Sequence, residues 1–120
     1  MIYMSEKIKV GIVGYGNLGR GAELAIKQQP DMELVAVFSR RGKVETVDPN
    51  VTSVHIDEAK NYQDKIDVMV LCGGSATDLP EQTPAFTEMF NTVDSFDTHA
   101  KIPEHFAAVD EVAQKSGKVS

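Results

Sequence analysis

Three glycines near the start of the chain have a spacing that suits a dinucleotide. Residues 14–19 read Gly-Tyr-Gly-Asn-Leu-Gly, the pattern G-x-G-x-x-G. In such a loop the first glycine permits a tight turn, the second lets the backbone approach a pyrophosphate, and the third lets a helix pack close to a sheet. The phosphates meet backbone N–H groups at the positive end of the helix. We therefore predict a dinucleotide site at Gly14, Tyr15, Gly16, Asn17, Leu18 and Gly19, the alternative being a glycine-rich turn without a ligand.

A pair of arginines indicates which dinucleotide binds. NAD-binding proteins carry an acid about 20 residues after the glycine loop, where it holds the ribose diol and repels a 2′-phosphate. Here that region reads Phe38-Ser39-Arg40-Arg41 and has no acid. Ser39 can donate a hydroxyl hydrogen bond, and the guanidinium groups of Arg40 and Arg41 suit phosphate. We predict NADP(H) as the cofactor; the alternative is that both arginines are solvated loop charges.

A second loop of small residues lies at the carboxyl edge of the predicted strand over residues 66–74. It reads Cys72-Gly73-Gly74-Ser75-Ala76-Thr77-Asp78, and a ribose or nicotinamide can pass close to such residues. Cys72 is interpreted as a small buried strand residue, because no histidine or acid motif nearby supports thiolate chemistry.

Acids and a histidine end the next predicted strand. Asp94, Asp97 and His99 stand where a pair of acids could bind a substrate ammonium, and ordinary loop acids are the alternative. His55 and His105 are isolated and lack metal-ligand spacing, so we interpret them as structural or surface residues and predict no metal site.

Alternating strand and helix patterns predict how these loops are held. We expect an α/β fold: a doubly wound, mostly parallel Rossmann-type sheet with helices on both faces and ligands at the carboxyl ends of the strands. The helix after the glycine loop should bury Leu18, Ala22, Ala25 and Ile26. The predicted strands are 7–13, 33–38, 54–56, 66–74 and a brief one within 92–98; the helices are 17–29, a weak segment over 58–65, 79–91 and 102–116; residues 42–50 form a loop.

Composition limits the class of protein. The 120 residues suffice for one domain, 42% are hydrophobic and 25% charged, and the net charge is -6. These values are typical of a globular protein and disfavour nucleic acid as a partner. No stretch has the length of a secretory signal or a membrane span, so we expect no membrane partner and a cytoplasmic protein. Residues 118–120 resemble the opening of another strand, so we expect residues 1–120 to be a dinucleotide-binding domain, the truncated N-terminal part of a longer two-domain enzyme.

Four stretches together resemble one enzyme family. They are GIVGYGNLGR (11–20), QPDMELVAVFSRR (29–41), LCGGSATDLPEQTP (71–84) and, more loosely, TVDSFDTHAKIPEH (92–105). In these segments the chain resembles the meso-diaminopimelate dehydrogenases, NADP-dependent enzymes of bacterial lysine metabolism. The resemblance implies reversible oxidative deamination of the D-centre of meso-2,6-diaminopimelate to L-2-amino-6-oxopimelate and ammonia, by a homodimer.

The resemblance also implies roles for residues. Tyr15 to Leu18 would line the pyrophosphate, Ser39 to Arg41 the 2′-phosphate, and Asp97 would be catalytic, facing the reacting amine. The loop contacts to the cofactor would come from Cys72, Gly74, Ser75, Ala76, Thr77, Asp78 and Leu79. The isolated 120 residues should then be inactive and of marginal stability. Two alternatives stay open: another NADP-dependent reductase of the aspartate pathway, and a stand-alone NADP(H)-binding module.

Overall fold

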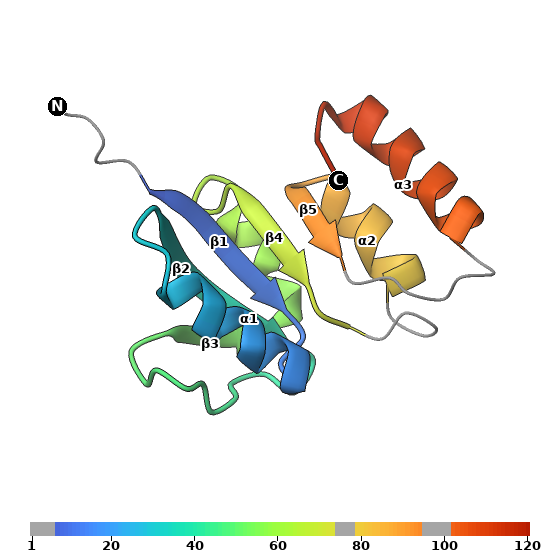
Figure 1. The fold of residues 1–120 in the computed structure, drawn as a ribbon. Coiled ribbons are helices and arrows are strands. Elements are labelled where there is room, and N and C mark those ends of the chain that lie inside the picture. The colour runs from blue at the N-terminus through green and yellow to red at the C-terminus, as the bar shows by residue number, and fades with distance from the viewer. Residues whose placement is uncertain (1–6, 74–78, 95–101) are drawn as a thin grey trace, which may run out of the picture.

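The computed structural model describes residues 7–73, 79–94 and 102–120. Within these ranges five strands form one parallel sheet in the order β3-β2-β1-β4-β5 (Figure 1). The chain starts at the centre of the sheet, winds to one edge, and then returns to wind to the other. This is the doubly wound arrangement that the sequence predicted. The strands are β1 (Ile8–Val13), β2 (Met32–Ser39), β3 (Thr52–His55), β4 (Val68–Leu71) and β5 (Asn91–Asp94).

Helices cover both faces of the sheet. Helix α1 (Asn17–Lys27) lies in front of the sheet in Figure 1, and the 3-10 helix η1 (Ile56–Tyr62) lies behind it. Helix α2 (Leu79–Thr87) packs on β4 and β5, and α3 (Ile102–Ser116) packs on α2. None of the helices in the described ranges is long and apolar enough to cross a lipid bilayer.

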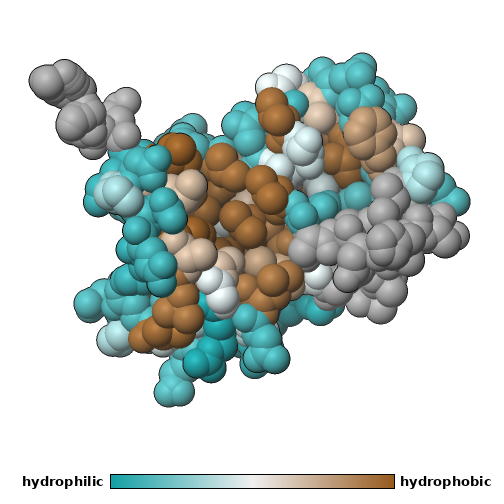
Figure 2. All heavy atoms as spheres, viewed as in Figure 1, coloured by the Kyte–Doolittle hydropathy of each residue, from teal (hydrophilic) through white to brown (hydrophobic). Residues whose placement is uncertain are grey.

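The face of the sheet under α1 is packed on one side and open on the other. Val37, Ile12, Val70 and Val93 pair across neighbouring strands and form one row. Val37 and Ile12 are fully buried in a cluster with Ile26 of α1, whereas Val70 is half-buried and Val93 is 56% exposed. Figure 2, viewed from the same side, shows hydrophobic residues gathered over this face beside α1. The β4–β5 half therefore presents apolar surface.

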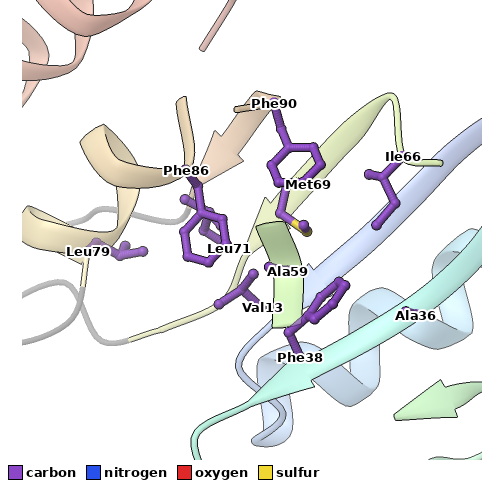
Figure 3. Close-up of a cluster of buried hydrophobic side chains, with 10 residues drawn as sticks. All are labelled: Val13, Ala36, Phe38, Ala59, Ile66, Met69, Leu71, Leu79, Phe86 and Phe90. Atoms are coloured by element: carbon purple, nitrogen blue, oxygen red, sulfur yellow. The ribbon is translucent and has the colours of Figure 1, made fainter. Parts of the chain in front are cut away.

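The opposite face holds the larger hydrophobic core. Val13, Phe38 and Leu71 lie side by side on the three central strands, and Phe86 of α2 lies beside Leu71 (Figure 3). The Phe38 ring meets the Tyr62 ring edge-on, with 5.1 Å between the ring centroids. Complete burial of a side chain of this size stabilises a fold by roughly 1.5–3 kcal/mol. This core fixes the ends of β1, β2 and β4 relative to one another.

The predicted strands and helices of the first half are confirmed with small shifts. β1 and β2 match their predicted ranges to within one residue at each end. The third strand lies at 52–55 rather than 54–56, because the His55 ring caps the next helix by accepting a hydrogen bond from the Asp57 N–H. The weak helical segment is therefore η1, a 3-10 helix that begins at Ile56.

Two predicted ranges in the second half are too long. The strand predicted over 66–74 pairs only from Val68 to Leu71. The helix predicted over 79–91 ends at Thr87, since the N–H groups of both Met89 and Phe90 donate to the carbonyl of Phe86, at 3.0 and 2.8 Å. Apolar residues continue beyond that point, and their spacing suggested more helix than the chain forms.

The predicted apolar face of α1 is partly wrong. Ile26 is buried and Ala22 is half-buried, as predicted, but Leu18 is 53% exposed and Ala25 is also exposed. The enclosed position in the middle of the helix is Glu23, whose exposed fraction is 0%. A carboxylate therefore occupies an enclosed position that the predicted apolar face did not include.

Helix α3 has the predicted bounds, and the chain after it returns to the sheet. Gly117 ends the helix with a φ of 70°. The Thr92 N–H of β5 then donates to the Val119 carbonyl at 2.8 Å, and the Val119 N–H donates to Asn91 Oδ1 at 2.9 Å. Residues 118–120 thus lie along β5; that they open a further strand stays a prediction.

Candidate cofactor-binding site

The carboxyl ends of β1, β2 and β4 open onto one cavity of about 300 Å³. Its walls come from the glycine loop, from the end of β2 and from the residues that follow β4, as expected for parallel strands. The structure therefore brings together segments that are distant in the sequence. Of the predicted residues, the cavity is lined by Gly14, Tyr15, Gly16, Ser39, Arg40, Arg41 and Cys72; Ile56, Gly73 and Gln82 complete it.

Each of the three positions in the loop has its own physical reason for being a glycine. Gly14 has a φ of 89°, and a Cβ on Gly19 would lie 2.4 Å from the Gly14 carbonyl oxygen, so the protein itself requires glycine at both positions. A Cβ on Gly16 would meet no atom of the described residues within 4 Å. Gly16 lines the cavity, so this position is a candidate for the close approach of a ligand.

The first turn of α1 offers backbone donors to an anion. Gly16 is the N-cap residue, has no side chain to cap the helix, and accepts from the Arg20 N–H at 3.0 Å. The first turn of the helix also contains no acid. The N–H groups of this turn and the helix dipole therefore point toward the place where a pyrophosphate binds in such loops.

The end of β2 is tied to the glycine loop by an arginine. One guanidinium nitrogen of Arg41 donates to the Tyr15 carbonyl at 2.9 Å, and the backbone N–H of Arg41 donates to the Ser39 hydroxyl oxygen at 3.1 Å. A guanidinium has several N–H donors in a planar fork, so this bond leaves the group able to bind phosphate oxygens as well. Arg40 follows Ser39, is exposed and lines the same cavity.

A buried carboxylate that the sequence reading missed supports this arrangement. Glu23 Oε1 accepts from the Tyr15 hydroxyl at 2.5 Å and from the Val47 N–H at 3.1 Å, and its Oε2 accepts from the Asp48 N–H at 2.9 Å. Burial and the bond to Glu23 raise the pKa of Tyr15, so the phenol keeps its proton and donates it. The available signal was spacing, because Glu23 lies four residues after Gly19, on the same face of the helix.

Cys72 contributes a neutral wall. Burial raises the pKa of its thiol to about 11. A thiol in this environment stays protonated near neutral pH and is a poor nucleophile. The interpretation of Cys72 as a small buried strand residue is partly wrong, because Cys72 directly follows β4 and is half-buried, packed against the cluster on the α1 side.

Gln82 is a second residue that the sequence reading missed. It lines the cavity from α2, and its Oε1 atom is buried with no hydrogen-bond partner in the described part of the structure. A buried acceptor without a donor is costly, by about 1–3 kcal/mol. A hydroxyl or amide N–H of a bound ligand can supply that donor.

A second cavity, of about 440 Å³, lies between β5 and α3. His105 Nε2 lies 2.7 Å from Asp94 Oδ2 at its edge, and the Thr83 hydroxyl donates to the same oxygen at 2.7 Å. The description of His105 as isolated is therefore wrong, because folding brings α3 against the end of β5. His55, by contrast, caps η1. Within the described ranges, no group of three or more His, Cys, Asp or Glu residues is arranged to hold a metal ion.

Several predicted site residues stay predictions. Asn17 and Leu18 are exposed in the first turn of α1. The Leu79 side chain is fully buried in the core, so a cofactor contact there must come from its backbone. Gly74 to Asp78 lie outside the described residues, and so do Asp97 and His99.

Known proteins resemble this chain over nearly its whole length. It is 65% identical over 116 residues to the meso-diaminopimelate D-dehydrogenase of Ureibacillus thermosphaericus, covering 96% of this chain and 36% of that protein. An engineered D-amino acid dehydrogenase bound to NADP⁺ has a TM-score of 0.87 at 45% identity, covering 92% of this chain and 34% of that one. The Corynebacterium glutamicum DAP dehydrogenase in complex with DAP has a TM-score of 0.86 at 45% identity, with the same coverage.

These similarities confirm the resemblance noted in the sequence and the Rossmann-type fold. The chain spans about a third of the length of the curated relatives that it matches. No family model matches the chain.

Proposed function

We propose that this chain is the NADP-binding part of a meso-diaminopimelate D-dehydrogenase. In this proposal residues 1–120 form the dinucleotide-binding domain of a longer, two-domain enzyme. The support is the similarity to dehydrogenases of that name, together with a cavity that joins the glycine loop to the end of β2. The reaction converts meso-2,6-diaminopimelate, NADP⁺ and water to L-2-amino-6-oxopimelate, ammonia, NADPH and a proton.

In this proposal each candidate residue has its own part in the reaction. When bound, the nicotinamide supplies the hydride acceptor. The first turn of α1 and Gly16 bind the pyrophosphate, and Ser39, Arg40 and Arg41 bind the 2′-phosphate. Asp97 binds the substrate ammonium and accepts a proton from it, which leaves the neutral amine. Loss of hydride then leaves an imine, and water hydrolyses the imine.

One observation carries the choice of cofactor. Arg40 and Arg41 line the cavity of the glycine loop at the end of β2, and the hydroxyl of Ser39 lies there in place of an acid. A carboxylate at this point would repel a 2′-phosphate, whereas two guanidinium groups attract it.

The test compares NADP with NAD on the natural polypeptide at its full length. Two charge-assisted contacts of about 1.5–3 kcal/mol each predict at least a hundredfold preference for NADP by calorimetry. Arg40→Ala should weaken NADP binding about tenfold or more and leave NAD binding nearly unchanged. The matched control is Lys43→Ala, which removes an exposed cation of the same loop that lines a different cavity. Equal affinities of the unaltered protein for the two cofactors would contradict the proposal.

A second test asks whether the glycine loop is the site. Gly16→Ala should lower the affinity for both cofactors, because the new methyl group occupies the place of the pyrophosphate. Gly21→Ala is the matched control, since a Cβ there also meets no atom within 4 Å in the described part of the chain but lies on an exposed part of α1. If the two variants bind alike and keep the native circular dichroism spectrum, the loop does not hold the pyrophosphate.

The role of Asp97 needs kinetics. Loss of a positioned acid–base group typically lowers a rate by about 10²–10⁴-fold, so Asp97→Ala should lower deamination far more than NADP affinity. Asp94→Ala is the comparison, because Asp94 is held by Thr83 and His105 on the α2 side of the sheet. If Asp94→Ala is the severe variant, the two roles are reversed.

The proposal also includes the assembly and the location implied by the resemblance. We propose a cytoplasmic homodimer that acts on meso-diaminopimelate. The substrate is supported by a similar enzyme solved in complex with DAP. Analytical ultracentrifugation of the full-length polypeptide checks the dimer, and a monomer at micromolar concentration would contradict it.

A further inference from the structure

Glu23 joins the glycine loop to the loop that follows Arg40 and Arg41. It lies on α1, its exposed fraction is 0%, and it receives three donors from these two loops. One donor is the hydroxyl of Tyr15 in the glycine loop. The other two are the backbone N–H groups of Val47 and Asp48, in the loop that continues from Arg40 and Arg41 toward β3.

The chemistry at this point fits a carboxylate and not its amide. All three groups that face Glu23 are donors, and an ionised carboxylate offers only acceptors. A glutamine would turn an NH₂ group toward either the Asp48 N–H or the Val47 N–H, whichever way its amide is placed. A buried donor that faces another donor loses its hydrogen bond, and that loss is costly.

Further bonds complete a closed frame around the same two loops. The Tyr15 hydroxyl lies 3.0 Å from the Val47 nitrogen, so the tyrosine contacts the second loop directly as well as through Glu23. At the other end of the same residue, the Tyr15 carbonyl accepts from Arg41. Lys27, one turn further along α1, forms an ion pair with Asp48. The loop that carries the arginines is therefore tied to the glycine loop near its start, at Arg41, and to Tyr15 and α1 further along, at residues 47–48.

We propose that Glu23 is a positioning residue for NADP selectivity: through Tyr15 and the 47–48 backbone it sets the place of Arg40 and Arg41 relative to the glycine loop. This inference rests on the proposed function, since it assumes that the arginines bind a 2′-phosphate. Preorganised groups bind more tightly than groups that must be ordered by the ligand. The pyrophosphate donors belong to the first turn of α1, which Glu23 does not contact in the hydrogen bonds described. Loss of Glu23 should therefore weaken binding of the 2′-phosphate more than binding of the rest of the cofactor.

The experiment measures a ratio of affinities in the full-length polypeptide. Calorimetry with adenosine 2′,5′-bisphosphate and with AMP isolates the 2′-phosphate from the nicotinamide half of the cofactor. In Glu23→Gln the preference for the bisphosphate should fall about tenfold while AMP affinity changes little, and in Tyr15→Phe the preference should fall about threefold. Glu45→Gln makes the same chemical change at an exposed position of the same loop and should leave the ratio unchanged.

Each outcome has a distinct meaning. If the unaltered protein does not prefer the bisphosphate, the proposed function itself fails. If it does, and Glu23→Gln keeps the preference, Glu23 has no positioning role and only this inference is overturned. A merely structural role would lower the melting temperature and leave the ratio of affinities in place. If Glu23→Gln does not fold, Tyr15→Phe decides, because it keeps the ring in the core and removes only the hydroxyl; an unchanged ratio in that variant overturns the inference.

Discussion

Two carboxylates on opposite faces of the sheet are used in different ways. Glu23 lies on the α1 side, is fully enclosed, and accepts from a phenol and two backbone N–H groups. Asp94 ends β5 on the α2 side, keeps 18% of its side chain exposed at the edge of an open cavity, and meets the Thr83 hydroxyl and the His105 ring.

The difference shows how surroundings decide the role of an acid. A carboxylate whose donors come from two loops fixes the distance between those loops, because a shift of either loop breaks a hydrogen bond to it. A carboxylate at the edge of a cavity, beside a histidine, remains reachable by water and solutes. The first arrangement holds two loops together next to the candidate site. The second joins the end of β5 to α3, the helix that follows it.

The largest difference should appear in stability. Glu23→Ala removes the acceptor of one buried phenol and of two partly buried backbone N–H groups, and should lower the free energy of unfolding by about 3 kcal/mol. Asp94→Ala should cost about 1 kcal/mol, since water can replace its oxygens at the cavity edge. Urea unfolding of the full-length polypeptide measures both. A larger loss for Asp94→Ala would reverse the comparison.

The reactivity of Cys72, which directly follows β4, extends the comparison to the middle of the sheet. β4 lies between β1 and β5, and Cys72 packs with the cluster on the α1 side. Because burial raises its pKa from 9.0 to about 11, alkylation by iodoacetamide at pH 8 should be about a hundredfold slower in the folded than in the unfolded protein.

The raised pKa of Cys72 also makes the stability of the fold depend on pH. Between pH 9 and 11 the unfolded chain loses the thiol proton first, so the contribution of Cys72 to stability is present at lower pH and is lost as the pH rises toward 11. For the alkylation test, the contrary outcome is a folded protein that reacts at pH 8 as fast as the protein unfolded in urea. That result would show that the Cys72 thiol is exposed to solvent.

The smallest effect concerns the coupling of Asp94 with His105. A double-mutant cycle with Asp94→Asn and His105→Gln should give a coupling of about 1 kcal/mol, because both side chains are largely buried. The matched pair is His55 and Asp57, 3.5 Å apart and exposed by 43% and 86%, for which no measurable coupling is expected. Equal couplings in the two cycles would show that burial does not distinguish them.

Local patterns in the sequence predicted the sheet and the meeting of its loops. β-branched runs before glycines predicted β1 and β4, and the carboxyl-end rule for parallel strands placed the glycine loop beside Ser39 and Cys72. Helix α3 was predicted to the residue, because Gly117 follows a long apolar pattern. These signals are contained in short segments, so a single sequence is enough to read them.

Contacts between distant polar groups could not be read in the same way. The sequence analysis assigned no role to Glu23, because its donors include two backbone N–H groups of a loop, which have no signature in the sequence. The end of α2 was also missed, since Met89 and Phe90 continue an apolar spacing that the following strand interrupts. The pairing of His105 with Asp94 depends on how α3 packs, which is a tertiary property.

The bond from Arg41 to the Tyr15 carbonyl has a consequence for the thermodynamics of anion capture. A loose arginine side chain carries about 2 kcal/mol of rotamer entropy, which it loses when a ligand fixes it. Here part of that freedom is already lost when the chain folds, before any anion arrives. Association with this loop should therefore carry a smaller entropic penalty than association with an arginine that moves freely in solvent. The rotamers of the Arg41 side chain are thus restricted in part by folding, and only the remaining freedom is lost when a ligand binds.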